Sequence, residues 1–408
     1  MNYSLTKTNG FVEILSKLIK IKKKQVYKHL LLLKKGKLHS LKFSSRFLLI
    51  GDYMKKKNKI LLIIIGTIIL ISASIFVFAN NLLNKVNYTD WSNTKVVNTS
   101  TIEVETEKNE EIENSEIEKI ESENIQLEEI DPLKSIPEVS NILLIGEENV
   151  YKDDRGRTDS MMILSLNKKD KSIKLISLMR DSYVKIPNHK DNRLNAAYSI
   201  GGVPLLIDTI QTNFGITINN TILVNFEAFE KIIDILGGVD IEITQTECEY
   251  LNKTNYISKE ESRICVPGIN HFNGIQALGY ARIRYVKGIT GETNDFGRTN
   301  RQRTLLLALF EKYKTSNLTT LLSLMNEILP YITTDMTKSE IINYIKAVLV
   351  MMPNEIETFR IPMDDSYKSV SIKGMSVLNL DWDKNREGLK SFIYGDLVPK
   401  EINSTEIP

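Results

Sequence analysis

The chain has 408 residues, of which 42% are hydrophobic and 25% are charged, and its 53 basic residues nearly balance its 51 acidic ones. This composition excludes a wholly disordered chain, a polytopic membrane protein and a disulfide-dense scaffold. Four histidines and two cysteines also leave too few ligands for a zinc site of the usual His and Cys type. The length predicts two or three structural units.

The net charge of +2 is the sum of segments that differ strongly. Residues 1–59 carry a net charge of +14, residues 101–131 carry −11, and residues 132–408 carry −2. We therefore divide the chain into a basic tail (1–59), an apolar run (60–79), an acidic stalk (80–135), a globular domain (136–330) and a C-terminal part (331–408).

Three alternatives account for the basic tail. Its lysines alternate with Ile and Leu, which suits a helix lying on an anionic membrane surface. Translation starting at Met54 would remove most of the tail, because Met54 is followed by three lysines, as in an ordinary membrane-protein N-terminus. A nucleic-acid-binding arm is the third alternative, and it is disfavoured because no helix-turn-helix pattern is present.

Residues 60–79 form an uncharged apolar run. A helix of that length covers roughly 30 Å, the thickness of the hydrocarbon core of a bilayer. A cleaved signal peptide would have a shorter apolar region, followed by a small-residue cleavage site. Four lysines lie at positions 55–59, so the positive-inside rule places the N-terminus in the cytoplasm. We expect a single-pass protein of the cell membrane whose body lies outside the cell.

The acidic stalk is rich in glutamate and has few large apolar residues. Such a segment predicts a solvated spacer that repels itself and holds the body away from the membrane.

Strand and helix patterns alternate through the body. We expect strands at 139–145, 160–166, 173–178, 221–225 and 239–243, and helices at 195–214, 227–236, 274–280, 297–315 and 338–351. The helix at 195–214 is expected to be interrupted at residues 201–204, where Pro204 fits a helix start. This alternation of strands and helices along the chain predicts an α/β fold in which a layered central β-sheet is flanked by helices. Residues 331–408 are expected to pack on the globular domain as a helix-rich extension or a small α/β appendage.

The two cysteines, Cys248 and Cys265, are 17 positions apart in a polar segment. Outside the cell they are placed to form a disulfide, and the alternative is two free thiols.

Arginine is the informative residue of the body. The chain has 40 lysines and 13 arginines, yet five arginines and one lysine lie between positions 282 and 303. A guanidinium stays charged and grips phosphate oxygens with two parallel hydrogen bonds. Arg282 and Arg284 share one side of an extended segment, while Arg298, Arg301 and Gln302 share one face of a helix. We therefore predict an anion site; the alternative is that these arginines pair with nearby acids such as Asp295.

Carboxylates accompany a second arginine group. Glu148 follows the first strand and Asp159 opens the second, so both are expected at one edge of the sheet. Mg²⁺ commonly binds one or two carboxylates together with phosphate oxygens, and Mn²⁺ is the alternative ion. Arg180 and Asp181 follow another strand, where α/β sheets place ligands, and Asp181 is interpreted as an ion-pair partner of Arg180. No glycine-rich nucleotide loop is present.

Eight motifs of the body together resemble those of the LytR–CpsA–Psr family. They lie at 141–146, 156–160, 177–182, 194–198, 237–239, 267–274, 276–284 and 295–302. Their order and the single N-terminal anchor also resemble that family.

The resemblance implies a phosphotransferase of the polyisoprenyl-teichoic acid–peptidoglycan teichoic acid transferase type. Such an enzyme moves teichoic acid, capsule or a secondary wall polysaccharide from undecaprenyl pyrophosphate to peptidoglycan, and a pyrophosphatase side activity would accompany it. By motif position, Glu148 and Asp159 would hold Mg²⁺, and Asp295 would lie nearby. The pyrophosphate would be gripped by Arg157, Arg180, Arg282, Arg284, Arg298 and Gln302. The isoprenoid tail would occupy an apolar tunnel between sheet and helices, lined from Leu205–Phe214 and Val224–Leu236, and the alternative is that these residues form ordinary core.

Two residues depart from the family pattern, because Glu148 stands where Asp is usual and Met179 where Pro is usual. Two other function classes stay open: an envelope-related transcriptional regulator, and a non-catalytic receptor for wall polymers. A DNA-binding body outside the membrane is physically impossible, so no nucleic-acid partner is expected for the body.

Overall fold

A computed structural model describes residues 80–91, 118–119, 127, 130, 135–148, 158–351 and 353–397. The strands are β1 (Asn87–Tyr88), β2 (Glu118–Lys119), β3 (Val139–Glu147), β4 (Thr158–Asn167), β5 (Ser172–Leu178), β6 (Tyr183–Val184), β7 (Asn192–Arg193), β8 (Asn220–Asn225), β9 (Val239–Ile243), β10 (Gly268–Phe272), β11 (Thr333–Thr334), β12 (Glu357–Ile361), β13 (Tyr367–Ile372) and β14 (Met375–Leu380). The helices are α3 (Leu194–Phe214), α4 (Phe226–Ile235), α5 (Gln245–Lys253), α6 (Gly274–Arg282), α7 (Asn294–Tyr313), α8 (Leu318–Ile328), α9 (Lys338–Met351) and α10 (Trp382–Tyr394).

Seven strands form a mixed central sheet in the order β1-β11-β8-β3-β4-β5-β12. The centre of the sheet pairs β3 and β4 antiparallel and β3 and β8 parallel, with a register shift between Gly146 and Glu147. The predicted α/β layered sheet flanked by helices is therefore confirmed, and each of the five strand ranges expected from the sequence lies within a strand of the structure.

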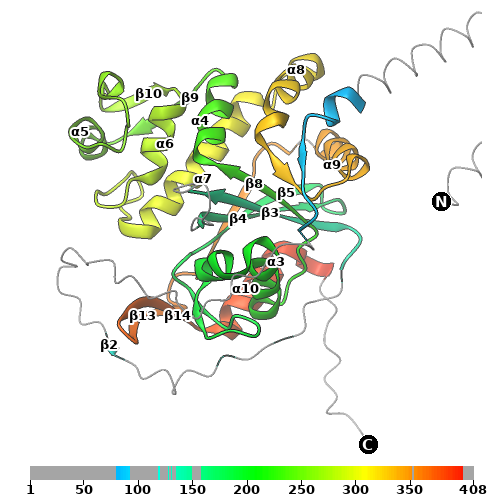
Figure 1. Ribbon diagram of the computed structural model, residues 1–408, viewed down its shortest axis with the longest axis vertical. Coiled ribbons are helices and arrows are strands. Elements are labelled where there is room, and N and C mark those ends of the chain that lie inside the picture. Colours follow the sequence, from blue (N-terminus) through cyan, green and yellow to red (C-terminus); the bar gives the residue numbers. More distant parts are fainter. Residues whose placement is uncertain are drawn as a thin grey trace, which may run out of the picture. The chain divides into compact units, whose positions relative to one another are not determined.

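The two faces of the sheet are covered by different helices (Figure 1). Helices α3 and α10 lie on one face, and α4, α6, α7, α8 and α9 lie on the other. Because side chains alternate along a strand, Leu143 and Met161 enter the core beneath α3 and α10, while their neighbours Leu144 and Met162 face the opposite helices.

Helix α3 is broken by its own sequence. Gly202 has φ +67° and ψ −154°, which no right-handed helix contains, and Pro204 begins the second part of the helix. This matches the helix start that the sequence predicts at Pro204, since a proline tolerates the first helical turn.

The C-terminal residues complete the sheet. Strand β12 pairs in parallel with β5 and forms one edge of the sheet, and β11 pairs antiparallel with β8 and lies between β8 and the edge strand β1. Helix α10 then packs on α3. The C-terminal part is therefore built into the same sheet.

The first described residues also belong to the body. Leu82 and Leu83 are buried, and β1 pairs with β11. The prediction that residues 80–135 form a spacer is therefore wrong for residues 80–91, because two leucines pack into a core that includes Ile142 and Leu166.

The predicted transmembrane helix at 60–79 and the basic tail lie outside the described residues. Among the residues that the structure describes, none of the helices is long and apolar enough to cross a bilayer.

Candidate active site

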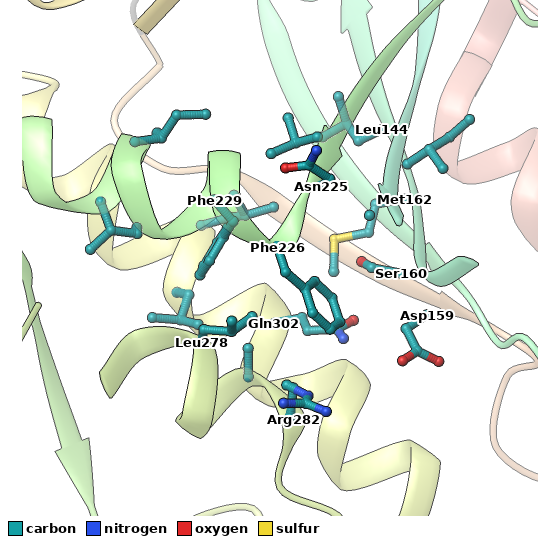
Figure 2. Close-up of a pocket in the computed structure, with 18 of the residues that line it drawn as sticks. Leu144, Asp159, Ser160, Met162, Asn225, Phe226, Phe229, Leu278, Arg282 and Gln302 are labelled. Carbon is teal, nitrogen blue, oxygen red and sulfur yellow. The ribbon is translucent and has the colours of Figure 1, made fainter. Parts of the chain in front are cut away.

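An apolar cavity of about 270 Å³ lies between the sheet and helices α4, α6 and α7. Its wall carries Leu144 and Met162 from the sheet, Phe226 and Phe229 from α4, and Leu278 from α6. In Figure 2 these apolar side chains surround one end of the cavity, whereas Asp159, Arg282 and Gln302 gather toward the other. The cavity is therefore amphipathic, with one charged end. The predicted lining from residues 224–236 is confirmed, and the predicted lining from residues 205–214 is wrong, because that segment of α3 packs on the opposite face of the sheet.

Strands β3 and β4 approach each other closely at the charged end of the cavity. Gly146 lies opposite Ser160, and a Cβ added at Gly146 would come within 3.0 Å of the Ser160 Cβ. The register of β3 and β4 shifts immediately after this pair, and Asp159 sits at the shift. A glycine at position 146 thus lets β3 and β4 stay close where both strands line the cavity.

Three arginines converge on two carboxylates at this end. The Asp159 carboxylate accepts hydrogen bonds from Arg180 Nη1 at 2.9 Å and from Arg298 Nη1 at 3.0 Å. Asp295 accepts one from Arg180 Nε at 2.8 Å and forms ion pairs with Arg298 at 3.1 Å and Arg284 at 3.4 Å. Four separate segments of the chain thus supply one charged cluster, which we call the arginine cluster (Asp159, Arg180, Arg284, Asp295 and Arg298).

The arginine cluster keeps its two carboxylates ionised. Burial alone would raise the pKa of Asp159, but Arg298, Arg180 and Arg284 lower it below the ordinary value. Burial likewise opposes ionisation of Asp295, yet its hydrogen bond with Asp181 and the neighbouring guanidiniums hold its pKa well below the usual range. The carboxylates in turn raise the pKa of Arg180 despite burial.

The pKa of Asp181 is shifted in the opposite direction, upward. Burial, a hydrogen bond with Asp295 and the like charge of that carboxylate raise the pKa of Asp181 to about 7, although Arg180 and Arg193 oppose the rise. Arg193 Nη1 lies 3.1 Å from Asp181. Asp181 and Asp295 therefore form a carboxyl pair that shares one proton near neutral pH. The ion pair predicted between Asp181 and Arg180 is present at 3.6 Å; the sequence did not indicate a role in proton transfer.

One buried donor of the cluster has no acceptor. Arg298 Nε is buried and makes no hydrogen bond with any residue that the structure describes, while Arg298 lines the cavity. An unpartnered buried N–H group is costly, and this one belongs to a residue that lines the cavity. The guanidinium geometry matches the oxygens of a phosphate.

Two other predicted residues meet at the rim. Arg282 Nη2 lies 3.5 Å from Glu148 Oε1, and the Arg282 guanidinium stacks 5.1 Å from the centre of the Phe226 ring. Arg282 and Gln302 line the same cavity as Asp159 and Arg298. Of the predicted site residues, Arg157 alone falls outside the described part of the chain.

The prediction that Arg301 faces the anion site is wrong. Its Nε donates to Glu247 Oε1 at 2.7 Å, and its other nitrogens donate to the carbonyls of Ile283 and Val286. Both charges of this pair are buried, and neither residue lines the cavity. The alternative of pairing with an acid holds for this arginine, although the partner lies on a different helix, α5.

The residues proposed for Mg²⁺ fit a partial ligand set. Glu148 and Asp159 end β3 and open β4 at the same edge of the sheet. No group of three or more His, Cys, Asp or Glu suited to a metal occurs among the described residues. Mg²⁺ often takes only one or two carboxylates and completes its shell with phosphate oxygens and water. Asp159 already accepts hydrogen bonds from Arg180 and Arg298, and the Mg²⁺ site stays a prediction.

The two cysteines are free and buried, so the disulfide is absent from this structure. Cys248 Sγ donates to the backbone carbonyl of Cys265 at 2.8 Å, which places the two residues side by side without a bond between their sulfur atoms.

The sequence profile of the LytR_cpsA_psr family matches residues 93–391. The polyisoprenyl-teichoic acid–peptidoglycan teichoic acid transferase TagU of Bacillus anthracis is 31% identical over 229 residues, covering 56% of this chain and 70% of that protein. The regulatory protein MsrR of Staphylococcus aureus is 29% identical over 271 residues, covering 65% of this chain and 77% of that protein. The crystal structure of TagV from B. subtilis superposes with a TM-score of 0.51 at 25% identity, covering 65% of this chain and 100% of that one.

Proposed function

The chain belongs to the LytR_cpsA_psr family, and we propose that it transfers an anionic glycopolymer from a polyprenyl diphosphate carrier to peptidoglycan. The observation that carries this proposal is the arginine cluster at one end of an apolar cavity, because a polyprenyl diphosphate has a doubly charged head and an apolar tail. A receptor would need the same grip, but it would not need a proton-sharing carboxyl pair beside it.

The guanidiniums position the diphosphate. Arg298 and Arg284 neutralise charge on its oxygens, Gln302 contacts it from α7 beside Arg298, and Arg282 contacts it from the end of α6. Phosphoryl transfer requires mainly in-line positioning and charge neutralisation, which fixed guanidiniums supply without reorganising. Glu148 and Asp159 would hold Mg²⁺, which supplies further neutralisation of phosphate charge when bound.

The carboxyl pair receives the proton. The acceptor hydroxyl of peptidoglycan attacks the glycan-linked phosphorus, the phosphoanhydride P–O bond breaks, and polyprenyl phosphate leaves. The hydroxyl proton passes to the Asp181–Asp295 pair, whose upper pKa lies at about 7, near the value that favours a general base at neutral pH. When the acceptor is absent, we expect water to take its place slowly, which gives a pyrophosphatase side activity.

Topology and partners follow from the sequence. We propose that residues 60–79 anchor the chain in the cell membrane and that the body faces outward, where carrier and peptidoglycan meet. A regulatory role would rest on the basic tail alone, so no nucleic-acid partner is proposed for the body.

The test uses the full chain in vesicles that contain an undecaprenyl-diphosphate-linked glycan and Mg²⁺, with peptidoglycan fragments outside. We expect glycan to become covalently attached to the fragments and polyprenyl phosphate to be released in equal amount. Tight binding of the carrier without either product would favour the receptor function instead.

A further inference from the structure

Helix α8 is apolar but lacks a buried residue. It has the sequence LTTLLSLMNEI, carries one acid and no base, and Leu318 at its start is 53% exposed. It packs on α4. An amphipathic helix of a water-soluble body normally buries its apolar stripe, so this half-exposed surface needs a partner.

The chain leaves the predicted membrane anchor beside this helix. A helical turn at 80–83 follows the apolar run directly, and Leu82 and Leu83 pack into the body. Lys85 Nζ then donates to the carbonyl of Asn326 in α8 at 3.4 Å, and Asn87 donates to Pro330 just after it. In Figure 1 the turn preceding β1 lies next to α8.

These contacts limit how far α8 can lie from the bilayer. Lys85 lies six positions after Ala79, so even an extended chain places the Lys85 backbone within about 20 Å of the end of the proposed anchor, and the helical turn shortens that reach. With residues 60–79 as an anchor, the α8 side of the body would lie near the bilayer.

The orientation of the cavity relative to α8 supports the same conclusion. Helix α7 carries Arg298 near its start and Leu309, another cavity residue, eleven positions later, which is about 16 Å along a helix axis. Helix α7 ends at Tyr313 and α8 begins at Leu318. The apolar end of the cavity therefore lies toward α8, and the charged end lies away from it.

We propose that α8 docks in the headgroup layer of the bilayer and forms the side of the body from which the carrier's polyprenyl tail passes into the cavity. Tyr88 and Tyr331, both exposed, lie on segments that adjoin α8, and tyrosine suits the membrane–water interface. Lys85, which donates to α8, supplies a cation toward anionic headgroups. The inference rests on the proposed membrane anchoring.

The docking arm of the test places a tryptophan on α8. The full-length Leu318→Trp variant is inserted into vesicles of equal phosphatidylcholine and phosphatidylglycerol, with or without bromine on the acyl chains. The matched control is Ile269→Trp, which is 75% exposed and lies on β10 in the two-stranded β9–β10 sheet. We expect brominated lipid to quench the emission of Leu318→Trp and leave that of Ile269→Trp at the background level of the two native tryptophans. Equal quenching in both variants would overturn the proposal.

The functional arm uses Leu318→Asp, whose position is too exposed to disturb the core. We expect its KM for a long-chain carrier in vesicles to rise about tenfold, the equivalent of withdrawing one leucine from an apolar environment. Its KM for a short-chain, water-soluble carrier should not change. An equal rise for both carriers would contradict membrane docking. Quenching at position 318 without any transfer by the wild type would instead reject the proposed function and keep α8 at the bilayer.

Discussion

The two faces of the central sheet are built from the same alternating strands, yet one is filled and the other holds a cavity. Met161 and Met162 are neighbours in β4 and each is 2% exposed, but Met161 lies in the core beneath α3 and α10 while Met162 lines the cavity. Burial therefore does not distinguish a structural methionine from one at a binding site. The difference arises from the opposing helices, because those above Met162 leave space that ends at the arginine cluster.

The charged end of the cavity should be the most sensitive to substitution. We expect Arg298→Ala to lower transfer by about 100-fold or more, because it removes a donor aimed at the diphosphate. It should also lower the free energy of unfolding by about 3 kcal/mol, since Asp159 and Asp295 lose a buried partner. Transfer assays and urea titrations measure the two effects.

The matched control removes the other buried pair of α7. The double variant Glu247→Met with Arg301→Met replaces both charges by apolar side chains, which is often nearly neutral for stability. It should retain transfer. A loss as large as that of Arg298→Ala would show that any buried arginine of α7 is required, and the cluster would lose its special role.

The methionine pair tests the two faces directly. Met161→Trp inserts a larger side chain into a filled core and should cost about 1–3 kcal/mol of unfolding free energy. Met162→Trp enters the cavity instead, so it should cost less stability and weaken binding of a long-chain carrier about tenfold. Equal stability losses and equal affinities in the two variants would remove the distinction between the faces.

Removing the metal tests the contribution of Mg²⁺ at the rim separately from that of the arginine cluster. We expect EDTA to lower transfer about tenfold, because Mg²⁺ contributes charge neutralisation in addition to that of the arginines. Binding of the carrier should persist, since Arg180, Arg284 and Arg298 need no metal. Glu148→Gln should raise the Mg²⁺ concentration needed for half-maximal transfer, and an unchanged requirement would exclude Glu148 as a ligand.

The smallest effect concerns the pH dependence of stability. The folded-state pKa of Asp181, about 7, exceeds the ordinary carboxyl value near 4, so the protonated form is favoured by folding. Its stabilising contribution is fully present below pH 4 and is lost as pH rises toward 7. Asp181→Asn should therefore flatten this part of the stability profile measured by urea unfolding. An unchanged slope would show that Asp181 titrates normally.

The sequence predicts the chemistry of this site better than its contacts. Arg180 and Arg298 were predicted because arginine is rare in a lysine-rich chain, and both reach the cluster. Arg301 has a similar sequence context, but its direction depends on Glu247 from a distant helix, which no local pattern reveals. The raised pKa of Asp181 depends in the same way on Asp295, which the fold brings to it.

The same limit applies to the elements of the fold. The five strands and the break at Gly202 follow from local patterns of apolar residues, glycine and proline. That Leu82 and Leu83 belong to the body could not be predicted, because two leucines after an apolar run look the same whether they continue the run or pack on Ile142. Placement of β11 beside β8 and of β12 at the edge next to β5 likewise depends on long-range pairing.

The central claim is that one cavity holds the diphosphate at its charged end and the polyprenyl tail at its apolar end. Calorimetric binding of a short-chain and a long-chain prenyl diphosphate to the wild type, Arg298→Ala and Met162→Trp tests it most directly. Arg298→Ala should weaken both ligands by a similar factor, and Met162→Trp should weaken only the long one. A Met162→Trp variant that binds both ligands as the wild type does would contradict the claim, because the tail would then lie elsewhere.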